Sequence, residues 1–248
     1  MESYKLTADE LMELNPEIAI IPIGSLEQHG PHLPLMTDWA IAADLGRRVA
    51  EKMNAFLLPA LPISNCHEQM GKKGSVWMQP TTLYQMMKDI ILCLKGQGFK
   101  KVGILQCHGG IFVLTPLIRE LNAMYNPELM VALIDSRLYA EPLIREGIYE
   151  TTTELHAGEG ETSKMLAIAP ETVHMDRAVD EVPTLPRNYL GYGNIFRLSK
   201  SGVWGEATCA SAEKGERVLE RSSEIAVEEL NKAFNFMENK EEYNGIYF

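Results

Sequence analysis

The sequence is poor in several features that mark particular classes of protein. It has only 4 cysteines in 248 residues, widely spaced and without a CxxC pair, which is unlike a disulfide-rich secreted domain. No apolar run approaches the ~18 residues needed to cross a bilayer, and the first residues lack the basic and then apolar pattern of a secretion signal. We therefore expect a cytoplasmic protein that does not enter a membrane, with its cysteines reduced and packed in the fold.

Basic side chains are also in a minority. The chain has 23 lysines and arginines against 34 aspartates and glutamates, a net charge of −11, which disfavours nucleic acid as a partner. It shows no internal repeat, no low-complexity tract and no linker, while 46% hydrophobic residues are enough for a large core. These features predict one domain over residues 1–248.

Short apolar runs alternate along the chain with segments of helical periodicity. The runs typical of buried strands are residues 17–23, 55–63, 100–107 and 129–136. Helices are expected over residues 38–53, 81–98, 115–125 and 211–237, with another beginning near Gly158. This alternation predicts an α/β fold with a mostly parallel sheet covered on both faces, whose ligands bind beyond the carboxyl ends of the strands.

Candidate metal ligands lie at those strand ends. Glu27 and His29 follow the first strand two residues apart, so that in an extended loop their side chains point the same way. Asp38 begins the next helix, and His108 ends a later strand. Carboxylates and imidazoles together suit Zn²⁺ or Mn²⁺, and one aspartate can bridge two ions. An acid from the segment HAGEGE, residues 156–161, would complete a two-metal site.

Each of these residues also has an ordinary structural alternative. An isolated Asp38 is typical of a helix N-cap, and Glu159 or Glu161 alone is typical of an acid that complements a helix dipole. A single loop histidine usually forms surface hydrogen bonds. Four of the six histidines, however, lie in glycine-flanked segments at expected strand ends or helix starts, where structure alone does not require them. Their combination favours a metal site.

Four segments resemble motifs of the creatininase (creatinine amidohydrolase) family, in the same order. EQHGPHLPLMTD, residues 27–38, is similar to the signature EQHGPHLPLGTD. LQCHGG, HAGEGETS and GVWGEATCASAEKGE are similar to NGHGGN, HAGExETS and GVxGDPxxAxxEKGE. The resemblance spans nearly the whole chain. It implies a three-layer α/β/α sandwich with two divalent ions per chain (zinc, manganese or iron) that hydrolyses an amide-type C–N bond.

The resemblance implies particular metal ligands. Glu27, His29, Asp38 and His108 match them, with Asp38 as the bridge between the ions. Creatininases proper have a glutamate two residues after the strand-end histidine, where this chain has a glycine. Relatives with HGG take that carboxylate from the HAGE segment, which points to Glu159 as the last ligand.

Other residues are assigned to the surroundings of the ions. His156 matches the family's catalytic histidine and would relay a proton to the leaving nitrogen. His32 and Glu161 are expected to support the ligands through hydrogen bonds. Gly109 and Gly110 lack a Cβ, so that their backbone N–H groups can approach a substrate or its oxyanion.

The irregular stretch of residues 64–79 is long enough to be functional. It lies between the second expected strand and the helix that begins near residue 81. Two of its residues, His67 and Glu68, are interpreted as bordering the active site or contacting a neighbouring subunit.

Departures from the family motifs bear on the substrate. Met36, Ile111 and Ala207 replace motif residues on the substrate side or in loops, and TTTEL precedes His156 where creatinine-specific enzymes have a tryptophan. These changes argue against creatinine itself. We expect hydrolysis of a small amide, cyclic amide or formamide by a homo-oligomer, a hexamer in the family. The alternatives are a peptidase-like member that trims a modified peptide behind a wider cleft, and a non-catalytic oligomeric binding protein.

Overall fold

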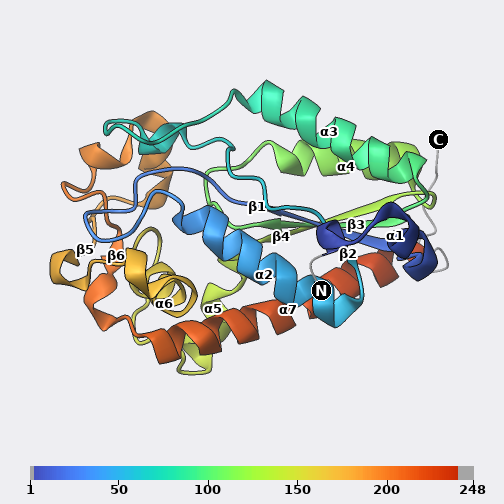
Figure 1. Ribbon diagram of the computed structural model, residues 1–248. Coiled ribbons are helices and arrows are strands. Elements are labelled where there is room, and N and C mark those ends of the chain that lie inside the picture. Colours follow the sequence, from blue (N-terminus) through green and yellow to red (C-terminus); the bar gives the residue numbers. More distant parts are fainter. Residues whose placement is uncertain (1–2, 240–248) are drawn as a thin grey trace.

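A computed structural model describes residues 3–239 and shows a parallel sheet between two layers of helices (Figure 1). Within these residues the main sheet has four strands in the order β2-β1-β3-β4, all parallel. The strands are β1 (Ile18–Ile23), β2 (Phe56–Leu57), β3 (Lys101–Gln106) and β4 (Met130–Asp135). The predicted α/β/α sandwich with a mostly parallel sheet is confirmed.

The helices divide between the two faces of the sheet. One face is covered by α3 (Pro80–Gly96) and α4 (Leu114–Tyr125), the other by α2 (Thr37–Met53) and α7 (Ala212–Glu238). Against α2 and α7 packs α6 (Glu159–Ile168). Two short helices were not predicted: α1 (Ala8–Leu14) and α5 (Ala140–Arg145).

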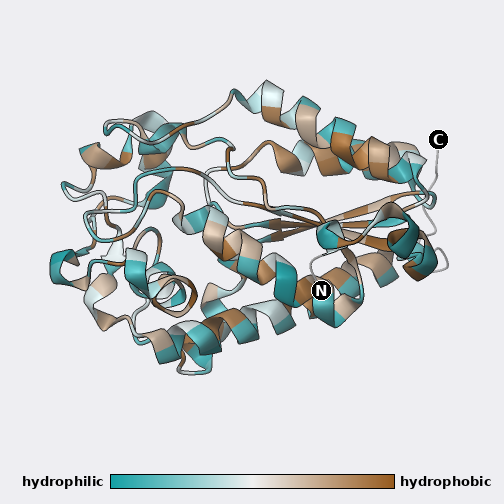
Figure 2. Ribbon diagram, viewed as in Figure 1, coloured by the Kyte–Doolittle hydropathy of each residue, from teal (hydrophilic) through white to brown (hydrophobic). Residues whose placement is uncertain are grey.

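Each face of the sheet has its own cluster of buried apolar side chains. One cluster joins the sheet to α2, α6 and α7, and the other joins it to α3 and α4. In Figure 2 the strands are mostly hydrophobic, whereas the outer surfaces of the helices are largely hydrophilic. The strands β1 and β3 are buried along all but their first residue, because helices exclude water from both faces.

The register brings the strand ends to one level. Ile23, the last residue of β1, pairs with Gln106, the last residue of β3, and Gln106 pairs with Asp135 at the end of β4. The loops that follow these strands therefore leave the sheet side by side. Irregular segments gather at the same end of the molecule, including the small antiparallel pair β5 (Asp180–Glu181) and β6 (Gly205–Glu206).

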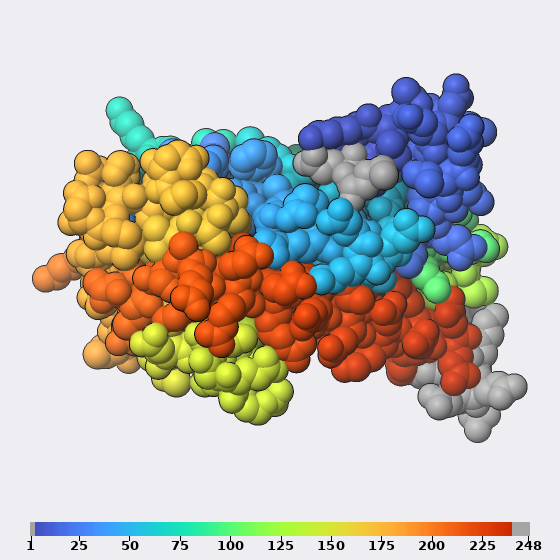
Figure 3. Space-filling model, turned by 60° about the horizontal axis from the view of Figure 1, so that its bottom comes forward, coloured from blue at the N-terminus to red at the C-terminus, as the bar shows by residue number. Residues whose placement is uncertain are grey.

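On the face of the molecule that α2 and α7 form, α7 covers much of the surface. Figure 3 shows it as an orange-to-red band along the length of this face, beside α2 in blue. Arg48 on α2 is 2.8 Å from the carboxylate of Glu216 and 3.1 Å from that of Glu220, both on α7.

No helix within residues 3–239 is long and apolar enough to cross a membrane. The expectation that all four cysteines pack in the core is wrong for Cys93, which is exposed.

The crossing of α6 and α7 depends on Gly215, in the first turn of α7. A Cβ at this position would lie 1.9 Å from the backbone oxygen of Ser163 on α6. This contact is between backbones, so that no side-chain rearrangement can relieve it. The sequence of α7 therefore needs a glycine at a position where helix propensity alone would favour alanine.

We expect Gly215→Ala to lower the free energy of unfolding by about 1–3 kcal/mol, the usual range for overpacking. The matched control is Gly96→Ala at the end of α3, because a Cβ there would meet no atom within 4 Å. This control should change stability by less than about 0.5 kcal/mol. Urea unfolding of both variants measures the difference, and equal stabilities would contradict the close approach of the two helices.

Candidate metal centre

Buried acids and imidazoles meet beyond the carboxyl ends of β1 and β3. Glu27 and His29 are 0% exposed, Asp38 1%, His108 4% and His156 6%. Within the described residues, three overlapping sets have ligand atoms within 4.8 Å of one another. They are Glu27 with His29 and His156; Glu27 with Glu68 and His108; and His29 with Asp38 and Glu161.

Asp38 lies at the centre of this cluster. Its Oδ1 is 3.1 Å from Nε2 of His29, and its Oδ2 is 2.9 Å from Nδ1 of His108. Ser25 also donates a hydrogen bond to Oδ2. The two oxygens thus face different imidazoles, and the side chain does not cap α2. Gly24 allows this position, because a Cβ there would lie 2.4 Å from the backbone oxygen of Asp38.

His156 reaches the cluster from the loop that precedes α6. Its ring centroid lies 4.3 Å from that of His29, and its backbone forms an antiparallel bridge with Trp204. The Nε2 atom is 2.9 Å from the backbone oxygen of Gln28 and donates its proton there. Nδ1 therefore carries the lone pair, and it lies 3.7 Å from Oε1 of Glu27. The next residue, Ala157, has a φ of +53°, a left-handed conformation that is uncommon outside glycine.

The structure places Glu161, and not Glu159, in the cluster. Oε2 of Glu161 is 3.6 Å from Nε2 of His29 and accepts a hydrogen bond from the backbone N–H of Ala157. Residues two apart on a helix point in very different directions, so that only one of these two glutamates can face His29. The sequence predicted Glu159 as a ligand and Glu161 as a supporting residue. In the structure it is Glu161 that lies beside His29, whereas Glu159 bonds to the backbone of Glu150.

Glu159 has a different set of partners. Its carboxylate accepts hydrogen bonds from the backbone N–H groups of Glu150 and Thr151, from the hydroxyl of Thr151 and from the ammonium of Lys214. Lys214 belongs to α7, so that this buried ion pair fastens the start of α6 to the last helix. Glu159 and Lys214 both lie in segments that resemble family motifs, and in this structure they form an ion pair.

The remaining predicted residues lie at the margin of the cluster. His32 is fully buried and its Nε2 is 2.9 Å from the hydroxyl of Thr162 on α6, the neighbour of Glu161, rather than beside a ligand. Burial, together with the charge of His29, lowers the pKa of His32 to about 4. Gly109 and Gly110 line a cavity, and the backbone oxygen of Gly109 accepts a hydrogen bond from Arg187.

That cavity has a volume of about 1200 Å³ and opens directly onto the cluster. Asp38, His108, His156 and Glu161 contribute to its inner wall. Its outer wall includes the apolar side chains of Phe112 and Leu190 together with Arg187 and Arg197. A molecule in the cavity can therefore reach the acids and imidazoles.

Burial and mutual charge strongly perturb the cluster. Burial raises the pKa of Glu27 to about 7. Burial opposes the charged form of His29, yet the negative charge of Asp38 raises its pKa to about 10. Burial likewise opposes protonation of His108, but Glu27 and Asp38 hold its pKa well above the usual value. Burial also disfavours the charge of Asp38, whose pKa is nevertheless lowered by His29 and His108.

The donor set fits divalent cations. Both carboxylate oxygens of Glu27 and the Nε2 atom of His108 are buried and make no hydrogen bond among residues 3–239, although Oε2 of Glu27 lies 3.2 Å from Nδ1 of His108 and Nε2 lies 3.0 Å from Oε1 of Glu68. Buried polar atoms are normally paired, and a cation bound by these side chains would pair with them. Carboxylate oxygens and imidazole nitrogens are the donors that Zn²⁺ and Mn²⁺ take in proteins.

Comparison with known proteins agrees with the fold and the donor set. The model of the creatininase family, described as creatinine amidohydrolase, matches residues 4–230. A creatinine amidohydrolase of Pseudomonas putida is 29% identical over 220 residues, which cover 82% of this chain and 84% of the relative. A 3-dehydro-scyllo-inosose hydrolase of Thermotoga maritima is 28% identical, with coverages of 82% and 73%. A mycofactocin precursor peptide peptidase of Mycobacterium ulcerans is 28% identical, with coverages of 86% and 84%.

Solved structures of creatininases resemble this chain over nearly its whole length. A mutant creatininase complexed with creatine has a TM-score of 0.79 and 26% identity, covering 93% of this chain and 97% of the other. A mutant creatininase of the Zn–Zn type has a TM-score of 0.75 and 27% identity, and a manganese creatininase has 0.76 and 26%, each with 98% of both chains covered. The fold of this chain is thus shared with creatininases of known structure. The chain belongs to the creatininase family.

We expect Glu159→Ala to reduce stability and Glu161→Ala to reduce metal binding. Glu159→Ala leaves Lys214 with Glu150 and the backbone oxygen of Cys209 but removes its buried partner and the acceptor of the Glu150 and Thr151 N–H groups, which should lower the free energy of unfolding by about 1–3 kcal/mol, with metal content unchanged. Glu161→Ala should reduce the bound metal but cost the metal-free protein little, because burial raises the pKa of this carboxyl and disfavours its charge. Urea unfolding and elemental analysis measure the two effects. Metal loss in Glu159→Ala alone would return Glu159 to the ligand set.

Metal binding should release protons. A ligand imidazole has to be neutral, whereas without a cation the pKa of His29 is about 10 and that of His108 is also raised. Since both are protonated at neutral pH, a cation displaces those protons, and affinity for Zn²⁺ should rise with pH from about 6 to 8. Calorimetry in buffers of different ionisation enthalpy counts the protons. A binding constant that is independent of pH would exclude His29 and His108 as ligands.

Proposed function

We propose that this chain is an amidohydrolase that binds two divalent ions, Zn²⁺, Mn²⁺ or Fe²⁺, and cleaves a C–N bond of a small amide, cyclic amide or formamide. The proposal rests mainly on Asp38, whose two buried oxygens face two different imidazoles. We assign Glu27, His29, Asp38, His108 and Glu161 as the residues that would hold the ions. Ions at such a site supply an activated water and polarise a carbonyl.

The side chains around the ions have separate tasks. His156 is the acid–base residue: burial and the charge of His29 hold its pKa well below the usual range, so that the ring is neutral and can accept a proton at Nδ1. The hydrogen bond from Nε2 to the backbone of Gln28 fixes this tautomer. The proton taken from the attacking water then passes to the leaving nitrogen. Gly109 and Gly110 line the cavity beside His108, where their backbone can approach a substrate.

A second candidate is a peptidase-like activity on a modified peptide. A cavity of about 1200 Å³ is larger than the ~300–1,000 Å³ typical of small-ligand pockets. It would admit a chain end with its side chains. The mycobacterial relative described as a peptide peptidase makes this substrate class worth testing beside small amides. A non-catalytic binding protein is disfavoured, since the acids and imidazoles that a metal-dependent hydrolase needs are all present and lie together.

The other expectations from the sequence stay predictions. They are a single domain over residues 1–248, a cytoplasmic location, a hexameric assembly and no nucleic-acid partner.

Metal analysis together with His156→Ala tests the proposed function. We expect two divalent ions per chain in the wild type and in His156→Ala, and loss of at least one in Asp38→Asn, which keeps the volume of Asp38 but not its charge. His156→Ala should slow hydrolysis of whichever amide or peptide proves to be a substrate by about 10²–10⁴-fold, the usual contribution of a general acid or base.

Each contradictory outcome has a distinct meaning. Wild-type protein that takes up neither Zn²⁺ nor Mn²⁺ would refute the metal site. Equal turnover by His156→Ala and wild type would remove His156 from the chemistry. Metal loss in His156→Ala would instead make it a ligand, consistent with its distance from Glu27.

A further inference from the structure

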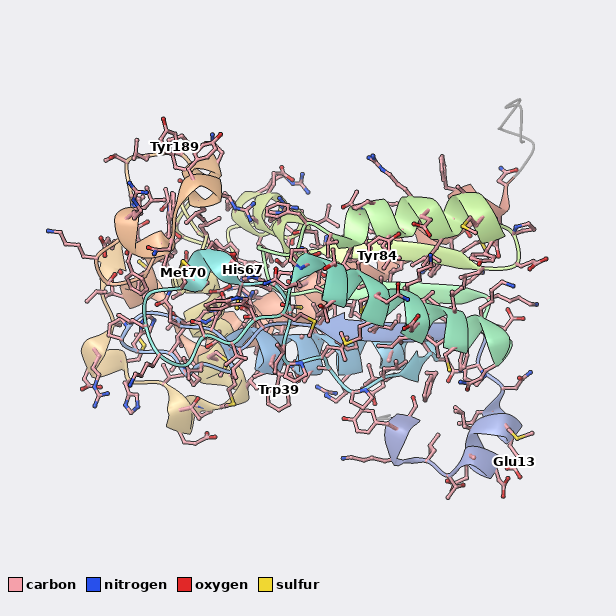
Figure 4. All side chains as sticks on the ribbon, turned by 90° about the horizontal axis from the view of Figure 1, so that it is seen from above. Glu13, Trp39, His67, Met70, Tyr84 and Tyr189 are labelled. Atoms are coloured by element: carbon pink, nitrogen blue, oxygen red, sulfur yellow. The ribbon has the colours of Figure 1, made fainter. Side chains whose placement is uncertain are left out.

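Glu68 is an acid in the cluster that comes from outside the strand ends. It lies on the short 3₁₀ turn His67–Gln69, within the loop between β2 and α3. Its Oε1 is 3.0 Å from Nε2 of His108, and its side chain is 18% exposed, on the wall of the cavity. Figure 4 shows this turn, marked by His67 and Met70, toward the end of the molecule opposite Glu13.

The carboxylate of Glu68 occupies space that Gly110 leaves free. A Cβ at Gly110 would lie 2.1 Å from Oε1 of Glu68 and 2.4 Å from Nε2 of His108. No side chain at position 110 can therefore coexist with Glu68 in its present place. Glycine at 110 and a carboxylate from residue 68 are two parts of one arrangement.

The loop that carries Glu68 is fastened to the loop that carries Glu27 and His29. Gln28 donates a hydrogen bond of 2.7 Å to the side chain of Gln69, directly after Glu68. The backbone N–H of Gln28 also donates to the hydroxyl of Ser75, and that of Val76 donates to the backbone oxygen of Leu26. Glu68 is thereby positioned by the same segment that supplies Glu27.

The spacing between Glu68 and His108 suits two ligands of one ion. Two donor atoms that each lie ~2.1 Å from a cation are about 3.0–3.4 Å apart, for octahedral or tetrahedral geometry. The observed 3.0 Å falls in this range. Nε2 of His108 faces Glu68, while Nδ1 of the same ring lies 3.2 Å from Oε2 of Glu27, and neither contact is a hydrogen bond within the described part of the chain. Glu27, Glu68 and His108 each offer one ligand atom within 4.8 Å of the others.

We propose that Glu68 is a metal ligand, binding the ion that Glu27 and His108 also bind. The inference rests on the proposed function, since it requires that ions bind at this centre. It adds a fourth carboxylate-bearing segment to the site, beside the loop of Glu27, α2 with Asp38 and α6 with Glu161.

Mn²⁺ binding to variants at 68 and 110 tests this inference. We expect Glu68→Ala to weaken one of two Mn²⁺ sites at least 10-fold, in equilibrium dialysis and in the electron paramagnetic resonance signal of free Mn²⁺. Glu68→Gln keeps the size of the side chain and should do the same if Glu68→Ala folds poorly. The matched control, His67→Ala on the same turn, should keep both sites, because His67 contacts Trp77 and no member of the cluster.

A variant at 110 provides an independent test. Gly110→Ala should lower the melting temperature and weaken Mn²⁺ binding, since a Cβ there collides both with Glu68 and with Nε2 of His108. Wild type with two sites and Glu68→Ala with two sites of unchanged affinity would overturn the role of Glu68 alone. Wild type that binds no Mn²⁺ or Zn²⁺ would instead overturn the proposed function.

Discussion

The structure depends on placing like charges together out of water. Asp38 and Glu161 have ligand atoms within 4.8 Å of one another and of His29, Glu27 belongs to a second set that also includes His29, and both Glu27 and Asp38 are almost fully buried. Carboxylates in such a site repel one another and lose hydration, which is costly unless protons or cations compensate. In the absence of a cation, protons on His29 and His108 provide part of this compensation. The cluster is therefore built for a positive charge that the amino acids themselves do not fully supply.

Contacts elsewhere in the fold keep these acids close together although their charges repel one another. Gly24 allows the first turn of α2 to approach the loop after β1, and Gly215 allows α7 to approach α6. The ion pair of Glu159 with Lys214 joins the start of α6 to α7. Close backbone approaches and a buried ion pair thus hold α2, α6 and α7 together, and a shift of α2 or α6 would separate Asp38 from Glu161.

The sequence predicted much of the site because its ligands follow apolar runs that are easily recognised. Glu27, His29 and His108 come at or near strand ends, and parallel strands bring such positions together whatever the details of packing. Asp38 was identified at the beginning of α2, although its side chain was equally consistent with a cap. The strands and long helices were predicted for the same reason, whereas α1 and α5 are too short to show a period.

The errors came from contacts between distant segments. Choosing between Glu159 and Glu161 required the rotation of α6 about its axis, which is set by the pairing of Glu159 with Lys214, 55 residues away. Glu68 lies in a loop whose path is fixed by hydrogen bonds to Gln28, 41 residues earlier in the case of Gln69. Neither contact leaves a local pattern. The length of the 64–79 stretch indicated that Glu68 borders the site, and Glu68 does line the cavity, but its distance from His108 could not be predicted from the sequence.

The level strand ends have a consequence for how this chain can change over time. Inserting a single residue into β3 would move His108 by about 3.3 Å and turn its side chain toward the opposite face of the sheet. Insertions in the loops would leave the pairing of Ile23 with Gln106 intact. Length variation among related chains should therefore accumulate in the segments 64–79 and 169–204, while the distance from the start of β1 to Glu27, and from the start of β3 to His108, stays constant. The sheet therefore fixes the positions of the ligands at its edge. The loops can change in length, and thereby in the substrates they admit, without moving those ligands.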